Sequence, residues 1–284
     1  MRSSTLAATL LTYALGASAA PSPHHKQAST HRIPTSRESA VLGRRILALT
    51  PIGTLATVFQ DGDSSTSHGE PSGLAGVPLS MMDYISDCTE HGDPTLLALN
   101  IETHFRNVRA GSNISLAVRW TPPYAPDKRI KSSHKSHTFQ SILSHIGWGP
   151  SEVTDEAEPH ESTSYSAANL PRFSLLGYIE AIDGGDDRSD PDSVGAQLAK
   201  CYTAAHPDAK YWLPGNRIHE AHFVRLVVTH VYWVGGFGDR AYIGWIPVEE
   251  WKNVTREEVE GVRLPGEKKG WDEWSVRYGG QEDL

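Results

Sequence analysis

The sequence of 284 residues predicts a mainly β fold, an antiparallel, Greek-key-like barrel with flanking helices. One observation is the stretch 95–120, TLLALNIETHFRNVRAGSNISLAVRW, which has the pattern of a buried strand, a short basic helix, a glycine break and a return strand. A second is that the strand-like segments follow one another without βαβ alternation. A third is the long alternating segment 223–234, FVRLVVTHVYWV, which a Gly-Gly-Phe-Gly turn follows.

The N-terminal segment, residues 1–19, has the features of a secretory signal peptide. Arg2 precedes an apolar run from Leu6 to Ala17, and Ala17-Ser18-Ala19 has the small residues that signal peptidase prefers. The run is shorter than the ~20 residues that a membrane-spanning helix needs. We therefore expect cleavage after Ala19 and a protein that is secreted or delivered to a vacuolar or lysosomal lumen. No later segment is apolar enough to span a membrane.

Residues 20–38 are expected to form a polar, disordered leader whose end caps the first helix. Ser36 is the expected N-cap, Glu38 lies in the first turn, and Thr50-Pro51 ends this helix. Strands are expected at 52–60, 74–84, 95–101, 114–120, 172–182, 223–234 and 241–246, and further helices at 103–110 and 194–205. The Val77-Pro78 interruption places the strand 74–84 at an edge or a bulge.

The domain is expected at 39–255, with an insertion at 121–169 that is rich in Pro, Ser, His and charge. A structureless loop of this length is unusual inside a compact domain, so we expect a mobile insertion. The alternative is a helical turn at 139–146 that packs against the barrel. The charged residues 256–284 are expected to form a peripheral tail.

Composition narrows the classes of function. The net charge is −8, and −9 without Arg2, whereas nucleic-acid binders usually carry a basic field.

Cys88 and Cys201 are the only cysteines, and an oxidising compartment would permit a disulfide between them. The sequence does not show whether the two approach each other. Asn113-Ile-Ser115 and Asn253-Val-Thr255 are sequons for N-glycosylation, and Asn113 lies where burial could block the transferase.

The C-terminal half resembles CREG proteins, which are secreted or lysosomal glycoproteins. The resembling segments are 206–208 (HPD), 212–216 (WLPGN) and the strand, Gly-Gly-Phe-Gly turn and proline-led segment that run from 223 into the Asn253 sequon. Upstream, 53–57 (GTLAT), 72–73 and 76–78 match the first strands of the family. The resemblance implies the FMN-binding split β-barrel of the pyridoxamine-phosphate-oxidase-like superfamily. It also implies a homodimer of barrels packed side by side, with the flavin site of flavin-using relatives at the dimer interface.

Four side chains on the short helix are the candidate cofactor-binding residues: His104, Arg106, Asn107 and Arg109. Arginine offers forked donors and a helix N-terminus adds oriented N–H groups, so this set could hold the phosphate of FMN. The alternative is structural: His104 and Asn107 tie the turn, while Arg106 and Arg109 are solvated or pair with Glu102.

The chain departs from the pattern of the flavin-using oxidases, which grip the phosphate with a basic R-x-V-x-L-K strand. The corresponding strand here, Pro78–Tyr84, reads PLSMMDY, with no Arg or Lys and with Asp83 instead. A carboxylate at that place repels a phosphate. We therefore expect no cofactor, with FMN as the alternative, and we assign no catalytic residue.

Two other motifs do not indicate a metal or nucleotide site. The His219-Glu220-Ala221-His222 sequence lacks the i, i+4 spacing of a helical zinc pair, so no metal is expected. Gly235–Gly238 lacks the G-x-G-x-x-G spacing of a nucleotide site. The sequence favours a non-catalytic binding or signalling module with a glycoprotein receptor or cell-surface partner. The alternative is an FMN-dependent, or haem-handling, oxidoreductase.

Overall fold

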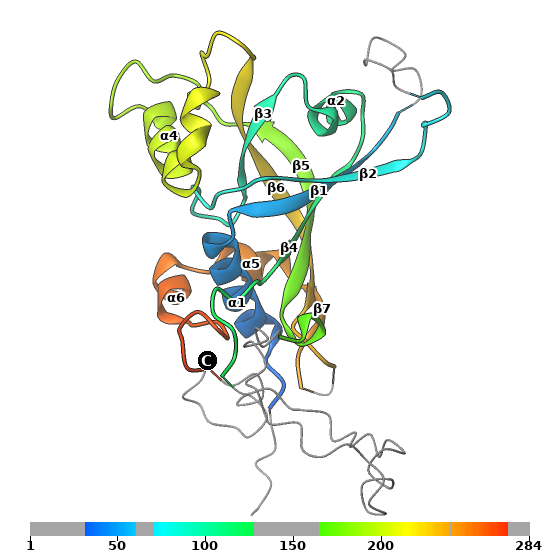
Figure 1. Cartoon of the computed structure of the whole chain (residues 1–284), viewed down its shortest axis with the longest axis vertical. Coiled ribbons are helices and arrows are strands. Elements are labelled where there is room, and N and C mark those ends of the chain that lie inside the picture. Colours follow the sequence, from blue (N-terminus) through cyan, green and yellow to red (C-terminus); the bar gives the residue numbers. More distant parts are fainter. Residues whose placement is uncertain (1–31, 61–70, 128–164, 239, 272–284) are drawn as a thin grey trace, which may run out of the picture.

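The computed structural model describes residues 32–60, 71–127, 165–238 and 240–271. Within them lies one seven-stranded antiparallel sheet in the order β2-β1-β4-β5-β6-β3, with β7 paired to β6. The predicted antiparallel barrel with flanking helices is confirmed (Figure 1). The predicted signal peptide, most of the leader and most of the insertion, including its alternative helix at 139–146, lie outside the described residues.

Strand and helix bounds agree closely with the sequence pattern. The strands are β1 (Ile52–Val58), β2 (Pro78–Tyr84), β3 (Thr95–Leu99), β4 (Ile114–Arg119), β5 (Arg172–Ala181), β6 (Ala221–Val234) and β7 (Ile243–Ile246). The helices are α1 (Ser36–Leu49), α2 (Thr103–Arg109), α4 (Val194–Ala205), α5 (Val248–Lys252) and α6 (Arg256–Gly261), with 3₁₀ turns at Ala167–Asn169 and Pro207–Tyr211. As its proline predicted, β2 is an edge strand.

The sheet closes on itself beyond β2. Ser86 and Thr95 exchange backbone hydrogen bonds of 3.1 and 2.8 Å, which connect the end of the β2 segment to β3 at the other end of the strand order. Between β5 and β6 the register shifts at Leu176/Gly177. A Cβ at Gly177 would lie 1.9 Å from the Val227 carbonyl oxygen, so this bulge requires glycine.

Alternation along the strands fills the barrel. Ile114, Leu116 and Val118 of β4 are buried while Ala117 and Arg119 are exposed. In contrast, β3 is buried on both faces, because Leu96 faces the main core and Leu97 packs with the α4 cluster. Double burial explains its continuous apolar run.

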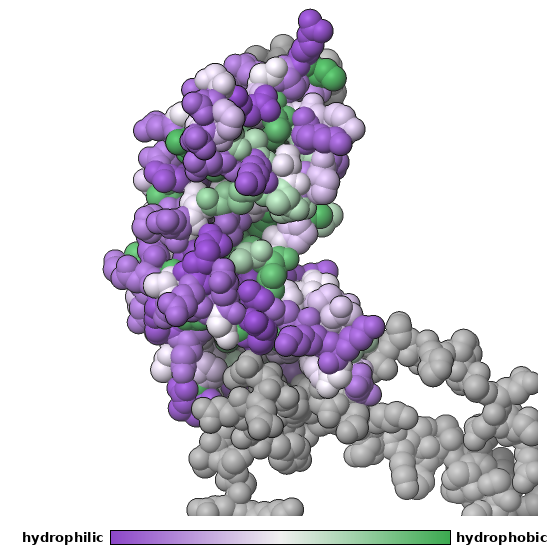
Figure 2. Space-filling view, turned by 90° about the vertical axis from the view of Figure 1, so that its left-hand side faces the viewer, coloured by the Kyte–Doolittle hydropathy of each residue, from purple (hydrophilic) through white to green (hydrophobic). Residues whose placement is uncertain are grey.

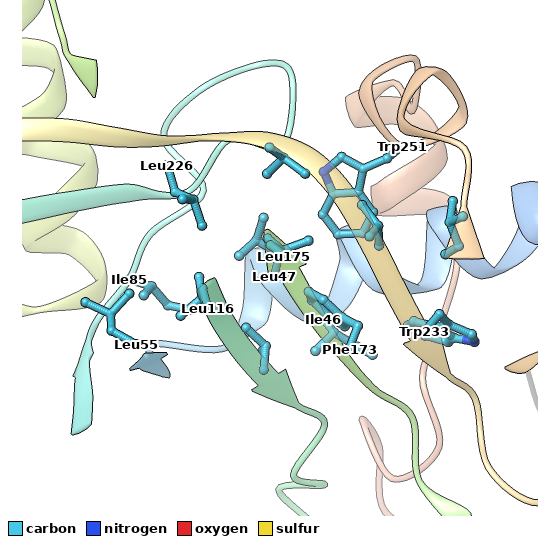
Figure 3. Packing of buried hydrophobic residues seen from close by; sticks show 14 of the residues in the cluster. Ile46, Leu47, Leu55, Ile85, Leu116, Phe173, Leu175, Leu226, Trp233 and Trp251 are labelled. Atoms are coloured by element: carbon cyan, nitrogen blue, oxygen red, sulfur yellow. The ribbon is translucent and has the colours of Figure 1, made fainter. Parts of the chain in front are cut away.

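Helices cover both ends of the barrel. α1, α5 and α6 lie together at one end, and α2 and α4 flank the other (Figure 1). In the main core, Ile46 and Leu47 of α1 lie with Trp233 and Trp251 (Figure 3). From the α4 and α6 side the surface is mainly hydrophilic, with hydrophobic residues gathered at mid-height (Figure 2).

Two predicted boundaries need correction. The N-cap of α1 is Thr35, not Ser36, because the Thr35 side chain and Glu38 form a reciprocal capping box. The fold also continues past 255. Val259 of α6 and Leu264 are buried in the main core, so the first part of the predicted peripheral tail belongs to the domain. Its high charge hid these apolar positions.

Two long-range links stabilise this arrangement. A disulfide joins Cys88, in the segment between β2 and β3, to Cys201 of α4, 113 residues later. The second is the buried guanidinium of Arg44, which donates to the carbonyl oxygens of Trp251 at 3.3 Å and Glu90 at 3.1 Å. Asp87, whose side chain is 4% exposed, lies 3.7 Å from Arg44. Burial opposes both charges, lowering the pKa of Arg44 and raising that of Asp87.

The change Arg44→Met is expected to destabilise the protein by about 3–5 kcal/mol, because it leaves Asp87 buried without its cation. The expected fall in Tm is about 10 °C for a domain of this size. Thermal and urea unfolding measure it. The double change Arg44→Met with Asp87→Leu should recover part of the loss. A single variant as stable as the wild type would contradict this account of Arg44.

Candidate functional site

The candidate residues on α2 divide into an inward and an outward set. His104 and Asn107 are buried, and both contact Thr57 of β1. The Asn107 side-chain amide donates to Thr57 Oγ1 at 3.0 Å, and Thr57 Oγ1 lies 3.1 Å from His104 Nδ1. Thr57 Oγ1 thus accepts from Asn107 and can donate its own proton to Nδ1 of His104. These two side chains tie α2 to the barrel.

The arginines of α2 occupy a different position. Arg109 is exposed and donates to the Asn100 carbonyl oxygen at 2.8 Å. Arg106 is half-buried and has interactions of its own within the chain. The structure therefore does not bring His104, Arg106, Asn107 and Arg109 together around one point where an anion could lie.

Carboxyl groups, instead of cations, gather at the start of α2. Glu102 is its N-cap residue but makes no capping hydrogen bond, and its Oε2 is buried without a partner. Burial, and then the charge of Asp83, raise the pKa of Glu102 to about 7. Burial raises the pKa of Asp83, on β2, to about 6. Sequence reasoning singled out Asp83 but missed Glu102 as its neighbour, because the register of β2 and α2 is tertiary.

Aromatic side chains lie next to these carboxyl groups. Tyr202 of α4 is 1% exposed, and burial followed by the charges of Asp83 and Glu102 raises the pKa of its hydroxyl. This hydroxyl donates to the Tyr84 carbonyl oxygen at 3.3 Å. The His206 ring stacks on Tyr84 with centroids 4.3 Å apart. These contacts fasten α4 to the end of β2.

The phosphate of a flavin does not fit this end of the barrel. Burial lowers the pKa of His104, so the ring is neutral at physiological pH. Both buried carboxyl groups repel an anion when ionised.

No metal site is present in the described part of the chain, where no three His, Cys, Asp or Glu side chains are grouped to hold an ion. His222 Nδ1 lies 2.6 Å from Asp186, and its Nε2 lies 3.4 Å from Glu220. His222 thus serves in ion pairs on the surface. Among the described helices none has the length and apolar character needed to cross a membrane.

The outer face of the sheet exposes apolar side chains that the sequence analysis did not single out. Met82, Tyr232 and Trp245 are 75%, 39% and 56% exposed. The strand registers place them in one row across the sheet: Met82, Thr54, Ala117, Ser174, Tyr232 and Trp245. Alternation alone could have flagged them as outward-facing apolar residues, which single strands often carry.

Both sequon asparagines are exposed. Asn113 precedes β4 in a turn, so burial does not obstruct it, and Asn253 is the C-cap of α5. The Cys88–Cys201 disulfide lies beside α4.

Comparison with known proteins identifies the family. A family model described as CREG, beta-barrel, matches residues 34–253. No curated protein sequence matches the chain.

Several solved structures are similar to this chain at low identity. A heme binding protein from Mycobacterium smegmatis is 20% identical with a TM-score of 0.44, over 77% of this chain and 60% of that one. HutZ, the heme storage protein from Vibrio cholerae, is 13% identical with a TM-score of 0.36, over 72% and 97%. An FAD-binding protein from Mesorhizobium loti is 13% identical with a TM-score of 0.34, over 66% and 88%. The chain thus spans 60% of the length of the Mycobacterium smegmatis protein. Likenesses at this level carry no information on ligands.

The raised pKa values of Asp83 and Glu102 predict a stability that falls as pH rises. In the unfolded chain both groups titrate near pH 4. Their protonated forms therefore favour folding, and this contribution is complete below about pH 4 and is lost as pH rises through 6 and 7.

The double change Asp83→Asn and Glu102→Gln should remove this loss. At about pH 7.5 we expect the free energy of unfolding of the variant to exceed that of the wild type by on the order of 2 kcal/mol, a value reduced to allow for the partial exposure of both groups. At about pH 4.5 we expect little difference. Urea unfolding of the wild type and the variant at pH values across this range measures the difference in the free energy of unfolding. The titration of His104 contributes equally to both proteins and therefore cancels. Glu249→Gln, at an exposed carboxylate of α5, is the matched control. An equal gain at both pH values would rule out ionisation as the cause.

Proposed function

The chain belongs to the CREG β-barrel family, and on this premise we propose that it is a secreted, N-glycosylated homodimer that acts as a non-catalytic binding or signalling module. The partner we expect is a glycoprotein receptor or another cell-surface protein.

The observation that carries the non-catalytic proposal is the pair of carboxyl groups at the start of α2. Asp83 and Glu102 stand where a flavin-using barrel needs cations for the cofactor phosphate. Asn107 and the Nδ1 atom of His104 contact Thr57 in the interior. A barrel that lacks this grip cannot orient a flavin, and without the flavin it has no redox chemistry to direct.

Three features of the chain support secretion and glycosylation: the predicted signal peptide, the disulfide and the exposed sequons. The predicted signal peptide at 1–19 directs the chain to an oxidising compartment, where a bond such as Cys88–Cys201 persists. Asn113 and Asn253 are exposed within N-x-S/T motifs, so the transferase can reach both.

A cofactor assay tests the central claim. Protein from a secreting host is incubated with excess FMN, desalted and scanned for absorbance, and the denatured supernatant is assayed for released flavin. We expect folded protein with neither stoichiometric flavin nor a haem absorbance band. A flavin-binding split-barrel protein taken through the same steps is the positive control. Stoichiometric flavin would instead establish the oxidoreductase alternative.

Enzymatic removal of N-glycans should lower the mass of the protein, and Asn113→Gln and Asn253→Gln should each reduce that change in mass.

The exposed row on the outer sheet face is our candidate for the dimer interface. Its members Met82, Tyr232 and Trp245 come from strands β2, β6 and β7, and the residues between them, Thr54, Ala117 and Ser174, are small. A flat, small-residue centre flanked by large apolar side chains suits the close approach of a second sheet. Aromatic residues and methionine are also the types enriched at interfaces.

Sedimentation velocity tests this interface. Trp245→Lys should convert dimer to monomer at micromolar concentration, because a charge on the row must be desolvated when the second copy binds. Ile218→Lys is the control, since Ile218 is 79% exposed in the segment before β6 and away from the row. A dimer that survives Trp245→Lys but not Ile218→Lys would place the interface elsewhere.

A further inference from the structure

A groove of about 680 Å³ lies on the outer face of the sheet and is built by five strands, β1, β2, β4, β5 and β6, and the turn before β1. Its lining contains two arginines, Arg119 at the end of β4 and Arg172 at the start of β5, and no aspartate or glutamate. The formal charge of this lining is therefore positive in a chain whose net charge is −8.

The two arginines are direct neighbours across the sheet. The register pairs Arg119 with Arg172, so their Cβ atoms are separated by about 5 Å, as for any directly opposed cross-strand pair. Like charges in such a pair destabilise a sheet. Neither guanidinium makes a hydrogen bond or ion pair with any residue that the structure describes, and both are exposed.

In a second cross-strand pair of the same sheet, the arginine lies opposite a residue of the other charge. Arg225 of β6 is directly opposite Glu180 of β5, and the two form an ion pair with two hydrogen bonds. Arg37 and Arg45 likewise pair with Glu258 and Glu267. The opposed Arg119 and Arg172 thus lack the acidic partner that the sheet provides for Arg225.

We propose that Arg119 and Arg172 bind a tetrahedral oxyanion, and that the natural ligand is a small organic phosphate or sulfate ester. Two guanidinium forks can together bind the three terminal oxygens of one such group, which also offsets their mutual repulsion. The exposed carbon-rich side chains of Ile52 and Met82 offer a surface for the organic part of the ligand. Hydroxyl groups of Thr54, Ser174 and Tyr232 line the same groove and can bond to its polar atoms.

This site differs from the predicted cofactor grip on α2. It uses none of His104, Arg106, Asn107 or Arg109 and needs one chain only. Five lining residues, Thr54, Met82, Ala117, Ser174 and Tyr232, also belong to the row proposed for the dimer. A second copy packed on that row would cover the groove, so ligand binding is measured on the monomeric variant Trp245→Lys as well as on the wild type. A failure of either proposal can then be recognised by itself.

Isothermal titration of the full chain with phenyl phosphate and phenyl sulfate tests the proposal, with inorganic phosphate, inorganic sulfate and phenol as companion probes. We expect binding of an ester that weakens as ionic strength rises. Tighter binding of phenyl phosphate than of inorganic phosphate would identify an ester ligand. Equal binding of the two would overturn the ester and leave a site for the free anion. The preferred member of the phosphate and sulfate pairs identifies the oxyanion.

Matched variants locate the site. Arg119→Gln and Arg172→Gln should each weaken phenyl phosphate binding about tenfold, and the double variant should abolish it. Arg225→Gln, which removes a half-buried arginine of the same sheet, should leave binding unchanged. Arg172→Lys keeps the charge and should retain part of the affinity, which serves as the test if a glutamine variant folds poorly.

A second readout uses stability without ligand. Since Arg172→Gln removes a like-charge contact, it should raise or preserve the Tm of the free protein while it loses the rise in Tm that phenyl phosphate produces in the wild type. No binding at millimolar concentration, or binding that the double variant retains, would overturn the proposal.

Discussion

The buried guanidinium of Arg44 is the contact on which the rest of the structure depends. It donates to carbonyl oxygens of the segment between β2 and β3 and of the end of α5, and it lies beside Asp87. The β2–β3 segment also contains Ser86, which closes the barrel, and Cys88, which is bonded to α4. One cation on α1 therefore couples the helical layer, barrel closure and the position of α4. The cost of desolvating it is offset by several hydrogen bonds that it donates to backbone carbonyl oxygens.

The same closure shapes the end of the barrel where a cofactor would lie. Because β2 ends against α4, Tyr84 and His206 stack there and Tyr202 is buried beneath them. This leaves Asp83 and Glu102 close together at the start of α2 in surroundings that favour their neutral forms. The space is filled by internal contacts, and its chemistry is acidic. The family fold is thus retained while the local residues no longer suit a phosphate.

The outer sheet face carries the features that suit intermolecular contact. Small residues lie in the middle strands of this face, and Met82, Tyr232 and Trp245 are exposed around them. Beside that row, the opposed Arg119 and Arg172 line a positively charged groove. Both proposed interaction surfaces therefore lie on the outside of the barrel.

Local patterns in the sequence were sufficient for most elements. The strand alternation, the proline of β2 and the glycine break after α2 led to the correct strands, the edge position of β2 and the antiparallel barrel, because these features depend on neighbouring residues. The segments that resemble CREG proteins are also local patterns, and they indicated the family. Contacts between distant segments lay beyond such patterns: the burial of α6, the proximity of Asp83 and Glu102, and the pairing of Arg119 with Arg172. Each depends on strand register and on which helix covers which end of the barrel, and a shift of one residue would turn every side chain to the other face.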